Sequence, residues 1–310
     1  MTKGSHAAEN DARNQDVLIY VNGEMVPRNE AKISVFDSGF LMGDGIWESA
    51  RLHEGVLVFI DDHLKRLFKG AKALAMNLKY SADDFKQMLY KTIKANDMYD
   101  HVHLRMMVTR GEKTTPYQSP AATKPGTTVV IIPEYKTPSV RKKNQGIKLF
   151  TAHVRRGYPD IQDHKINSHS KHNCIQACIQ AIAAGADEAL MLDPHGFVAT
   201  CNSTHFFMVT HGEVWTSSGD FCLGGITRGK IIDLCQQLKI PVKEKNFSLF
   251  DVYSADEVFI TGTFAGVTPV VSVDGRDIGN PEHYTVMKTL QQAYMKLIVA
   301  DVQQQQNATP

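Results

Sequence analysis

Apolar strand-like runs and helical stretches alternate along the second half of this 310-residue chain. The strand-like runs are rich in aliphatic and aromatic residues, and the stretches between them repeat apolar residues at helical spacing. This alternation predicts a mixed α/β fold. The expected strands are "IKLFTAHV" at 147–154, "EALML" at 188–192, "HFFMV" at 205–209 and "DEVFI" at 256–260, and the expected helices cover 169–184, 226–238 and 282–300.

The first half carries its own strand and helix signals. Alternating apolar residues flank an Asn-Gly pair in "VLIYVNGEMV", which predicts a β-hairpin. Apolar residues then recur at helical spacing, and an aspartate precedes them as a candidate cap. The expected elements are the hairpin at 17–26, a helix over 61–78 capped by Asp61 or Asp62, a helix from Ser81, and strands at 101–109 and 127–132.

A linker is expected between the two halves. The stretch "EYKTPSVRKKNQG" concentrates Pro, Lys, Gly and polar residues between two strand-like runs. A chain of this length accommodates two domains at about 150 residues each. The expected organisation is a disordered N-terminus at 1–16, a small α/β domain at 17–133, the linker at 134–146, a larger α/β domain at 147–300 and a disordered, low-complexity tail at 301–310.

The composition favours a small-molecule partner. With 34 Lys+Arg against 33 Asp+Glu the net charge is +1, which gives no field for nucleic acid or an anionic membrane. The apolar runs are too short to span a bilayer, and the polar N-terminus lacks the apolar stretch of a signal peptide. The five cysteines are an odd number without paired spacing, so reduced thiols and a cytoplasmic location are expected.

Two short motifs are compatible with phosphate binding. In "CLGGITRGKIIDLC" two glycines precede a helix, where the free amides of Ile226 and Thr227 can meet an anion at the positive end of the helix dipole. In "ITGTFAGVTPV" a strand ends in a turn of small residues with exposed amides and hydroxyls. On spacing alone, an ordinary loop is the better explanation of the first motif, and the second motif establishes nothing by itself.

The segment "IQDHKINSHSK" contains two lysines and several polar residues. The residues alone leave open whether Lys165 or Lys171 attaches a cofactor or whether both are solvated surface charges. A metal site on His164, His169 and His172 is not expected, because no carboxylate or cysteine pair completes a ligand set.

The stretch "SVFDSGFLMGDGIWESARLHEGVLVFIDDHLKRLFKGAKAL" at 34–74 resembles the opening signature of the fold-type IV pyridoxal-phosphate enzymes. This family includes branched-chain aminotransferases, D-amino-acid aminotransferases and 4-amino-4-deoxychorismate lyases. The resemblance continues in order through "RMMVTRG", "VRRGYPDIQDHK", "GITR" and "TGT" with "TPV", over residues 17–298. The matching residues of the first stretch are Asp37, Gly39, Phe40, Gly43, Asp44, Gly45, Trp47, Glu48, His63, Leu64, Arg66 and Leu67.

The resemblance implies a two-domain fold-type IV architecture, a homodimer and the cofactor pyridoxal 5'-phosphate. It implies that Lys165 forms the Schiff base with the cofactor aldehyde and then moves a proton between substrate and cofactor. Lys171 would then be a surface charge at the start of a helix. The cofactor phosphate is expected to bind the guanidinium of Arg66 and the amides of Ile226, Thr227 and Thr263.

Two arginines compete for the substrate carboxylate. Arg105 matches the arginine of branched-chain aminotransferases, whereas Arg110 in "TRG" matches that of D-amino-acid aminotransferases. In a regular strand the two side chains point to opposite faces, so only one is expected to face the cofactor. Trp47 replaces the usual Phe or Tyr of the family and is expected to reshape the substrate pocket.

The pattern departs from the family at the cofactor ring. The family usually places a glutamate beside the pyridine nitrogen, and Thr200 occupies its position in "GFVATCNSTHFF", with His205 in place of an asparagine. A neutral hydroxyl is expected to leave the nitrogen largely unprotonated and the ring a weaker electron sink. The tyrosine that follows the lysine in branched-chain enzymes is also missing, so His169 or Ser168 is expected to contact the phenolate oxygen.

The sequence therefore predicts an aminotransferase that acts on an amino acid, with branched-chain amino acids as one candidate class, and a 2-oxo acid. A lyase or elimination enzyme is the alternative, because a weak electron sink handicaps it less. A third hypothesis is a non-catalytic homologue that only binds the cofactor, and the presence of Lys165, Arg66 and both phosphate turns argues against it.

Overall fold

The computed structural model describes residues 10–308 and divides them into two compact units. The described part of the N-terminal unit contains residues 10–137, the short segment Ile166–Ser170 and the residues from Ala300 onward. The C-terminal unit contains Pro138–Lys165 and Lys171–Val299. The chain therefore leaves the C-terminal unit after Lys165 and returns to it at Lys171.

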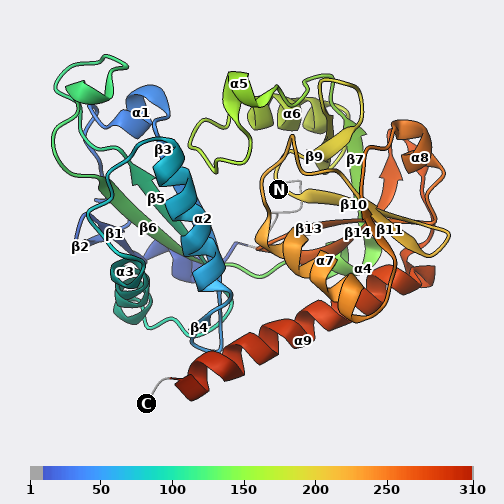
Figure 1. Ribbon diagram of the computed structural model, residues 1–310. Coiled ribbons are helices and arrows are strands. Elements are labelled where there is room, and N and C mark those ends of the chain that lie inside the picture. The colour runs from blue at the N-terminus through green and yellow to red at the C-terminus, as the bar shows by residue number, and fades with distance from the viewer. Residues whose placement is uncertain (1–9, 309–310) are drawn as a thin grey trace. The chain divides into compact units, whose positions relative to one another are not determined.

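An antiparallel sheet forms the centre of the N-terminal unit (Figure 1). Its six strands among the described residues follow the order β2-β1-β6-β5-β3-β4. The predicted hairpin is confirmed, because Asn22 and Gly23 both have positive φ and join β1 to β2. The strands are β1 (Leu18–Val21), β2 (Glu24–Pro27), β3 (Gly45–His53), β4 (Val56–Leu57), β5 (Val102–Thr109) and β6 (Thr128–Tyr135).

Helices α2 (Ile60–Ala73) and α3 (Ala82–Ala95) cover one face of this sheet (Figure 1). Their apolar side chains meet those of the strands in one core that includes Leu64, Phe85, Leu104 and Ile131. Alternation along β5 turns Arg105 and Met107 to the opposite face, away from this core. Smaller elements of this unit are a 3-10 turn at Ala12–Gln15, α1 (Ser38–Met42) and a 3-10 turn at Pro120–Ala122.

The starts of the two helices differ in how they are capped. Ser81 caps α3 with a capping box, in which its hydroxyl accepts from the Asp84 amide and the Asp84 carboxylate accepts from the Ser81 amide. The expected cap of α2 was wrong, because the N-cap is Phe59, with positive φ and no side-chain hydrogen bond. Asp61 and Asp62 lie inside the first turn, where their charges favour the helix dipole.

A larger mixed sheet forms the centre of the C-terminal unit. Among the described residues it has nine strands in the order β12-β11-β10-β13-β14-β7-β8-β9, with β15 beside β14. The β7–β8, β7–β14 and β11–β12 pairs are parallel, and the others are antiparallel. The strands are β7 (Ile147–Thr151), β8 (Glu188–Leu192), β9 (Val198–Cys201), β10 (His205–Thr210), β11 (Glu213–Thr216), β12 (Val242–Glu244), β13 (Glu257–Gly262), β14 (Gly266–Val273) and β15 (Arg276–Asp277).

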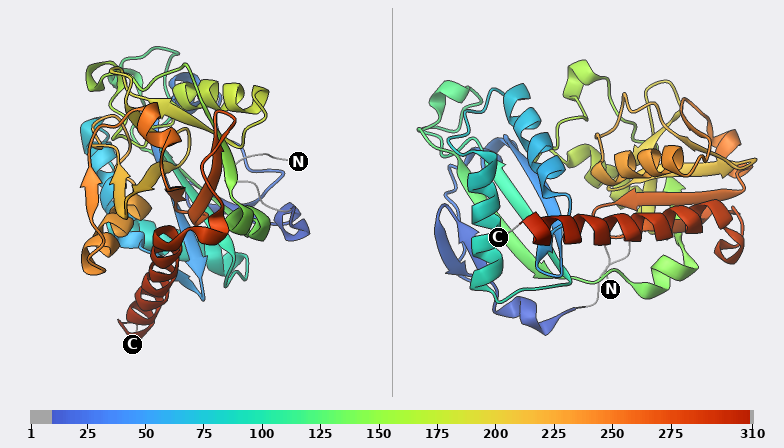
Figure 2. Two further views of the ribbon diagram at one scale, coloured as in Figure 1. Left: turned by 90° about the vertical axis from the view of Figure 1, so that its right-hand side faces the viewer. Right: turned by 60° about the horizontal axis from the view of Figure 1, so that its bottom comes forward.

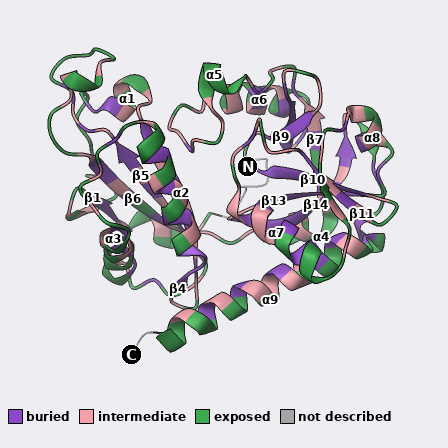
Figure 3. Ribbon diagram, in the orientation of Figure 1, coloured by how far each residue is buried: buried purple, intermediate pink, exposed green. Residues whose placement is uncertain are grey.

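Helices of the C-terminal unit pack on both sides of its strands. The alanines Ala177 and Ala181 of α6 allow close packing on Ala189 and Met191 of β8. Figure 3 shows the strands of this unit largely buried and the outer faces of its helices exposed. The remaining elements are α4 (Val140–Gln145), α5 (Pro159–Gln162), α6 (His172–Ala183), α7 (Ile226–Gln237), α8 (Leu249–Tyr253), a 3-10 turn at Pro281–His283 and α9 (Thr285–Ala308).

Three segments that were expected to lack structure form helical turns. Residues 12–15 form a 3-10 turn in the stretch expected to be disordered, and α4 lies inside the expected linker. The expected disordered tail was wrong, because α9 continues unbroken to Ala308, as both views in Figure 2 show. Val302 is buried there and Asp301 accepts a 2.9 Å hydrogen bond from the Phe59 amide, which fixes the helix end. Residues 1–9 and 309–310 lie outside the described part.

Across residues 10–308, no helix is both long enough and apolar enough to cross a membrane.

Candidate active site

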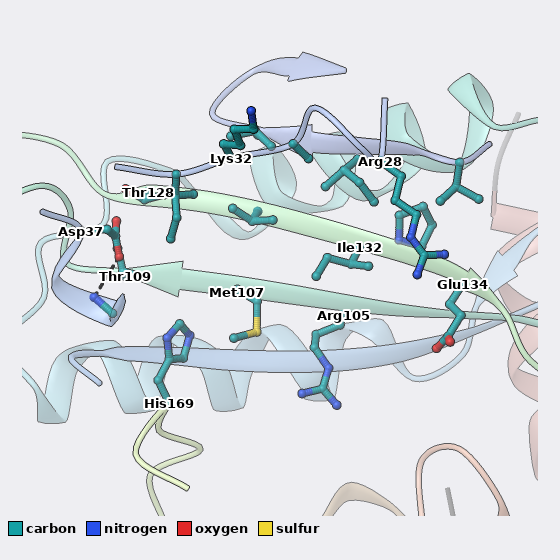
Figure 4. Close-up of a pocket in the computed structure, with 18 of the residues that line it drawn as sticks. Arg28, Lys32, Asp37, Arg105, Met107, Thr109, Thr128, Ile132, Glu134 and His169 are labelled. Carbon is teal, nitrogen blue, oxygen red and sulfur yellow. Dashed lines mark hydrogen bonds between the residues drawn. The ribbon is translucent and has the colours of Figure 1, made fainter. Parts of the chain in front are cut away.

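A pocket of 680 Å³ lies on the face of the N-terminal sheet that α2 and α3 leave uncovered (Figure 4). Side chains of β1, β5 and β6 form an apolar floor that includes Ile19, Met107, Val130 and Ile132. Arg105 projects from β5 into this space (Figure 4). A cation above an apolar floor suits an organic acid with an apolar body.

Arg105 has no ion-pair or hydrogen-bond partner within the described residues, although it is partly buried. Its guanidinium carbon lies 4.2 Å from the centre of the Trp47 ring, which is a cation–π contact. Burial lowers the pKa of Arg105, and the charge of Glu134 opposes this shift. The guanidinium is therefore oriented by the indole and retains its donors for an anion.

The guanidinium of Arg110, by contrast, donates its hydrogen bonds to other groups of the protein. Its Nε and Nη2 donate to the two oxygens of Asp44 at 2.6 and 3.1 Å. Further bonds reach the carbonyls of Leu74 and Ala75 at 2.8 and 3.2 Å. Arg110 thus ties the turn before β3 to the end of α2, which is a structural task.

Arg66 lies on α2 beside a buried carboxylate. Its Nε and Nη2 donate to Glu48 at 2.7 and 2.8 Å, and His63 Nδ1 lies 2.8 Å from the same carboxylate. Burial alone raises the pKa of Glu48, but the hydrogen bonds from Arg66 and His63 outweigh it and leave the pKa below its usual value. Glu48 therefore fixes the direction in which Arg66 points.

The residues after Lys165 pair with β3. The Trp47 amide donates to the Asn167 carbonyl at 3.0 Å, and the Asn167 side chain donates back to the Trp47 carbonyl at 2.7 Å. The His169 amide donates to the Gly45 carbonyl at 2.9 Å, and His169 reaches the pocket (Figure 4). A Cβ at Gly45 would lie 2.8 Å from the His169 ring, so this position requires glycine.

The two candidate lysines occupy different kinds of position in the C-terminal unit. Lys165 is exposed at the end of a loop. Burial raises the pKa of the Cys222 thiol, and the positive charges of Arg228, Arg156 and Lys165 oppose this increase. Lys171 is the N-cap of α6, where it contributes no side-chain capping bond.

His164 holds the loop that leads to Lys165. The Gly157 amide donates to its Nε2 at 3.0 Å, and Arg156 Nη1 lies 3.3 Å from its Nδ1. Burial and the charge of Arg156 lower the pKa of His164 to about 4, so the imidazole is neutral at physiological pH. Nowhere in residues 10–308 do His, Cys, Asp and Glu side chains cluster as a metal site requires.

The start of α7 is an open set of amides. Gly225 is the N-cap without a side-chain capping bond, and Ile226 and Thr227 are the first helical residues. Thr227 is buried, with its hydroxyl 3.3 Å from that of Tyr294. A Cβ at Gly225 would collide with the ring of His205. The free amides and the dipole of a twelve-residue helix favour an anion here.

Thr263 lies in the turn between β13 and β14. Shortly before it, the hydroxyl of Thr261 is buried without a hydrogen-bond partner within the described chain. His205 pairs with Thr261 across β10 and β13. Because His205 also contacts Gly225, the start of α7 and the end of β13 lie side by side. An orphaned hydroxyl at this place fits a further acceptor such as phosphate oxygen.

Thr200 lies at the end of β9 and is buried. Its hydroxyl donates to the Thr204 carbonyl at 2.8 Å, inside the turn that leads to β10. Glu188, which sequence reasoning did not single out, binds the same turn from β8. Its one sequence signal is a carboxylate at the start of the otherwise apolar strand "EALML".

Residues 45–273 match the family described as amino-transferase class IV. The chain belongs to this family. Relatives with similar sequences also confirm the resemblance to branched-chain aminotransferases. Putative branched-chain-amino-acid aminotransferase of Methanocaldococcus jannaschii is 35% identical over 277 residues, which are 89% of this chain and 94% of that one.

Plant relatives of the class IV protein are longer. Branched-chain-amino-acid aminotransferase-like protein 2 of Arabidopsis thaliana is 40% identical over 284 residues, which are 92% of this chain and 51% of that one. A second Arabidopsis relative, branched-chain-amino-acid aminotransferase-like protein 1, has the same coverage. The chain thus spans about half the length of these two relatives.

Solved structures confirm the expected fold of the class IV protein. The branched-chain amino acid aminotransferase of Escherichia coli has a TM-score of 0.85 at 27% identity, over 91% of this chain and 95% of that one. A branched-chain amino acid aminotransferase from T.th., solved with N-(5'-phosphopyridoxyl)-L-glutamate, has a TM-score of 0.83 at 28% identity, over 92% and 95% of the two chains.

The predicted site residues fall into two groups. In the N-terminal unit, Trp47 contacts Arg105, which lines the pocket, whereas Arg66 and Arg110 are held by Glu48 and Asp44. In the C-terminal unit, His205 joins the α7 start to the end of β13. The residues of this second group are Lys165, Thr200, Ile226, Thr227 and Thr263.

Proposed function

We propose that the chain is a pyridoxal-phosphate-dependent aminotransferase that moves an amino group between an amino acid and a 2-oxo acid. Membership of the class IV aminotransferases supports this activity. Support for the cofactor comes from solved relatives that carry a phosphopyridoxyl-glutamate adduct or pyridoxamine 5'-phosphate. When bound, this cofactor supplies an electron-withdrawing ring that accepts charge from the substrate carbon.

The residues of the chain fit the cofactor. The amides of Ile226, Thr227 and Thr263 offer donors to a phosphate, and Thr261, whose hydroxyl has no partner in the described chain, pairs with His205, which contacts Gly225. Arg66 adds a guanidinium whose direction Glu48 fixes. The exposed amine of Lys165 is suited to covalent attachment and to moving a proton at the substrate α-carbon.

The contrast between Arg105 and Arg110 carries the assignment of the substrate site. A substrate carboxylate needs a guanidinium with unused donors, and Arg105 retains its donors whereas Arg110 spends its own on Asp44, Leu74 and Ala75. Trp47 and the apolar pocket floor suit an aliphatic side chain. We therefore assign the α-carboxylate to Arg105 and include branched-chain amino acids among the substrates.

The proposed enzyme is a homodimer. Large apolar side chains are exposed at and before α1, next to the pocket, and burying them against a second copy would be favourable. They are Ile33, Val35, Phe36, Phe40 and Met42. All five cysteines are free thiols, which is compatible with the cytoplasmic location that we propose.

Two measurements test this function. Amino transfer to 2-oxoglutarate or pyruvate from a panel of amino acids should be detectable, and release of ammonia or pyruvate without an acceptor would instead indicate the lyase alternative. Borohydride reduction of the loaded protein should leave the cofactor on a peptide containing Lys165. Lys165→Ala should abolish this labelling and Lys171→Ala should not, so labelling of Lys171 would contradict the proposed attachment.

A further inference from the structure

The hydroxyl proton of Thr200 is already used inside the protein. A threonine hydroxyl has one proton and two lone pairs. The proton of Thr200 goes to the Thr204 carbonyl at 2.8 Å, and that carbonyl also accepts from the Cys201 amide at 3.0 Å. Thr200 can therefore offer only lone pairs to any further partner.

Glu188 holds the turn that fixes this orientation. One of its carboxylate oxygens accepts from the Ser203 amide at 3.0 Å, the Ser203 hydroxyl at 2.8 Å and the Thr204 hydroxyl at 2.8 Å. Thr204 thus links the two sites, since its hydroxyl binds Glu188 and its carbonyl binds Thr200. Hydrogen bonds joined in this way polarise one another.

The carboxylate of Glu188 has no counter-ion among residues 10–308. It is 1% exposed, its second oxygen is buried without a hydrogen-bond partner in the described chain, and no cation lies within ion-pair distance. A buried negative charge of this kind favours a positive charge nearby. The turn at residues 200–204 therefore combines the lone pairs of the Thr200 hydroxyl, which can accept a hydrogen bond, with the negative charge of the Glu188 carboxylate.

We propose that Thr200 accepts a hydrogen bond from the protonated ring nitrogen of the cofactor, and that Glu188 is the positioning residue that supplies the buried negative charge. This inference rests on the proposed function, which brings the ring nitrogen to Thr200. A hydroxyl that donates would select the unprotonated nitrogen, and a hydroxyl restricted to accepting selects the protonated one. The geometry thus points away from the unprotonated ring expected from the sequence alone.

The ring nitrogen itself provides the readout. The protein is loaded with pyridoxal phosphate that carries ¹⁵N in the ring, and the ¹⁵N resonance reports whether the nitrogen is protonated. We expect the protonated resonance in the unmodified chain at neutral pH and in Thr200→Ser. Thr200→Val, which keeps the branched shape and removes the acceptor, should shift the resonance to that of the unprotonated nitrogen.

Glu188→Gln tests the source of the charge. The amide retains an acceptor for Ser203 and Thr204 but carries no charge, so the pH at which the ring loses its proton should fall by about one unit. Two matched controls should leave the resonance unchanged. Thr216→Val removes a buried hydroxyl that donates to the Phe206 carbonyl, and Glu257→Gln neutralises a buried carboxylate at the start of α9.

The outcomes separate this inference from the proposed function. Cofactor attached to Lys165 with an unprotonated ring in the unmodified chain would overturn the inference alone, and so would a resonance that Thr200→Val does not move. If Glu188→Gln leaves the ¹⁵N resonance unchanged, as Glu257→Gln should, Glu188 does not help to protonate the ring nitrogen. Failure of the unmodified chain to bind the cofactor would overturn the proposed function and the inference with it. Should Thr200→Val not fold, the unmodified chain and Glu188→Gln still decide the matter.

Discussion

The carboxylate of Asp44 accepts two hydrogen bonds from the guanidinium of Arg110, with N–O distances of 2.6 and 3.1 Å. Both groups are largely shielded from solvent, with side-chain exposures of 20% and 13%. Arg105, on β5, contacts an aromatic ring and forms no ion pair with a carboxylate of the described residues. The two arginines therefore differ in what their removal should cost.

Removing Arg105 should weaken substrate binding and spare the fold. Arg105→Gln loses a charge-assisted contact of about 1.5–3 kcal/mol, which corresponds to roughly a 10- to 150-fold higher KM for amino acid and 2-oxo acid. Arg110→Gln should instead lower the free energy of unfolding by about 2–3 kcal/mol, because it leaves Asp44 unpaired. Steady-state kinetics and urea unfolding of both variants measure the contrast. An Arg110→Gln enzyme of normal stability with a raised KM would reverse the assignment.

Arg66 and Glu48 should act as one unit in cofactor binding. Arg66→Ala should weaken cofactor affinity by about 1.5–3 kcal/mol, since a phosphate contact is lost. Glu48→Gln should weaken it less, and the double variant should match Arg66→Ala, because Glu48 acts through Arg66. Titration of each apoprotein with cofactor provides the affinities. Lys65→Ala, a neighbouring exposed cation on α2, is the control and should bind normally.

Gly225 should tolerate a methyl group only when His205 is smaller. Gly225→Ala forces the new Cβ into the His205 ring and should cost about 1–3 kcal/mol of stability as well as cofactor affinity. Combining it with His205→Asn should restore much of both. Gly224→Ala is the matched control, since nothing lies within 4 Å of a Cβ there. Thermal unfolding with and without cofactor would test this, and an additive double variant would rule out the clash.

His164 should make the protein less stable as the pH falls. Its pKa drops from an ordinary 6.5 to about 4 on folding, so the unfolded chain binds more protons between these values. Stability therefore decreases as the pH falls through this window. His164→Gln should lose less stability between pH 7 and pH 5 than the unmodified chain in urea unfolding. His211→Gln removes an exposed histidine and should follow the unmodified chain.

Local patterns predicted the elements whose own residues determine them. The Asn22-Gly23 turn, the Ser81 cap and the buried strand at 188–192 each depend on neighbours in the chain. The helix at the end of the chain was missed over its last turns, because its polar composition resembles a disordered tail. Val302 and the Asp301–Phe59 bond hold those turns through residues far away in the sequence.

The candidate site shows the same limit. Motifs indicated Lys165, Arg66 and the start of α7, because glycine spacing and the family signature are visible in the sequence. The partners that give these residues their roles are non-local. Neither the occupation of Arg110 by Asp44 nor the contact of His205 with Gly225 could be inferred from spacing. A lone strand carboxylate such as Glu188 gives almost no signal before its turn is in place.

The N-terminal unit contains Ile166–Ser170 and the residues from Ala300 onward, in addition to its main stretch. During synthesis, the Trp47 amide has no hydrogen-bond acceptor in this unit until Asn167 has emerged from the ribosome. The Phe59 amide likewise forms its bond only after Asp301 has been made. The unit therefore completes its structure only when almost the whole chain has been made. A fragment that ends at the linker would expose the edge of β3, so the first half of this protein should need either the second half or a chaperone to remain soluble.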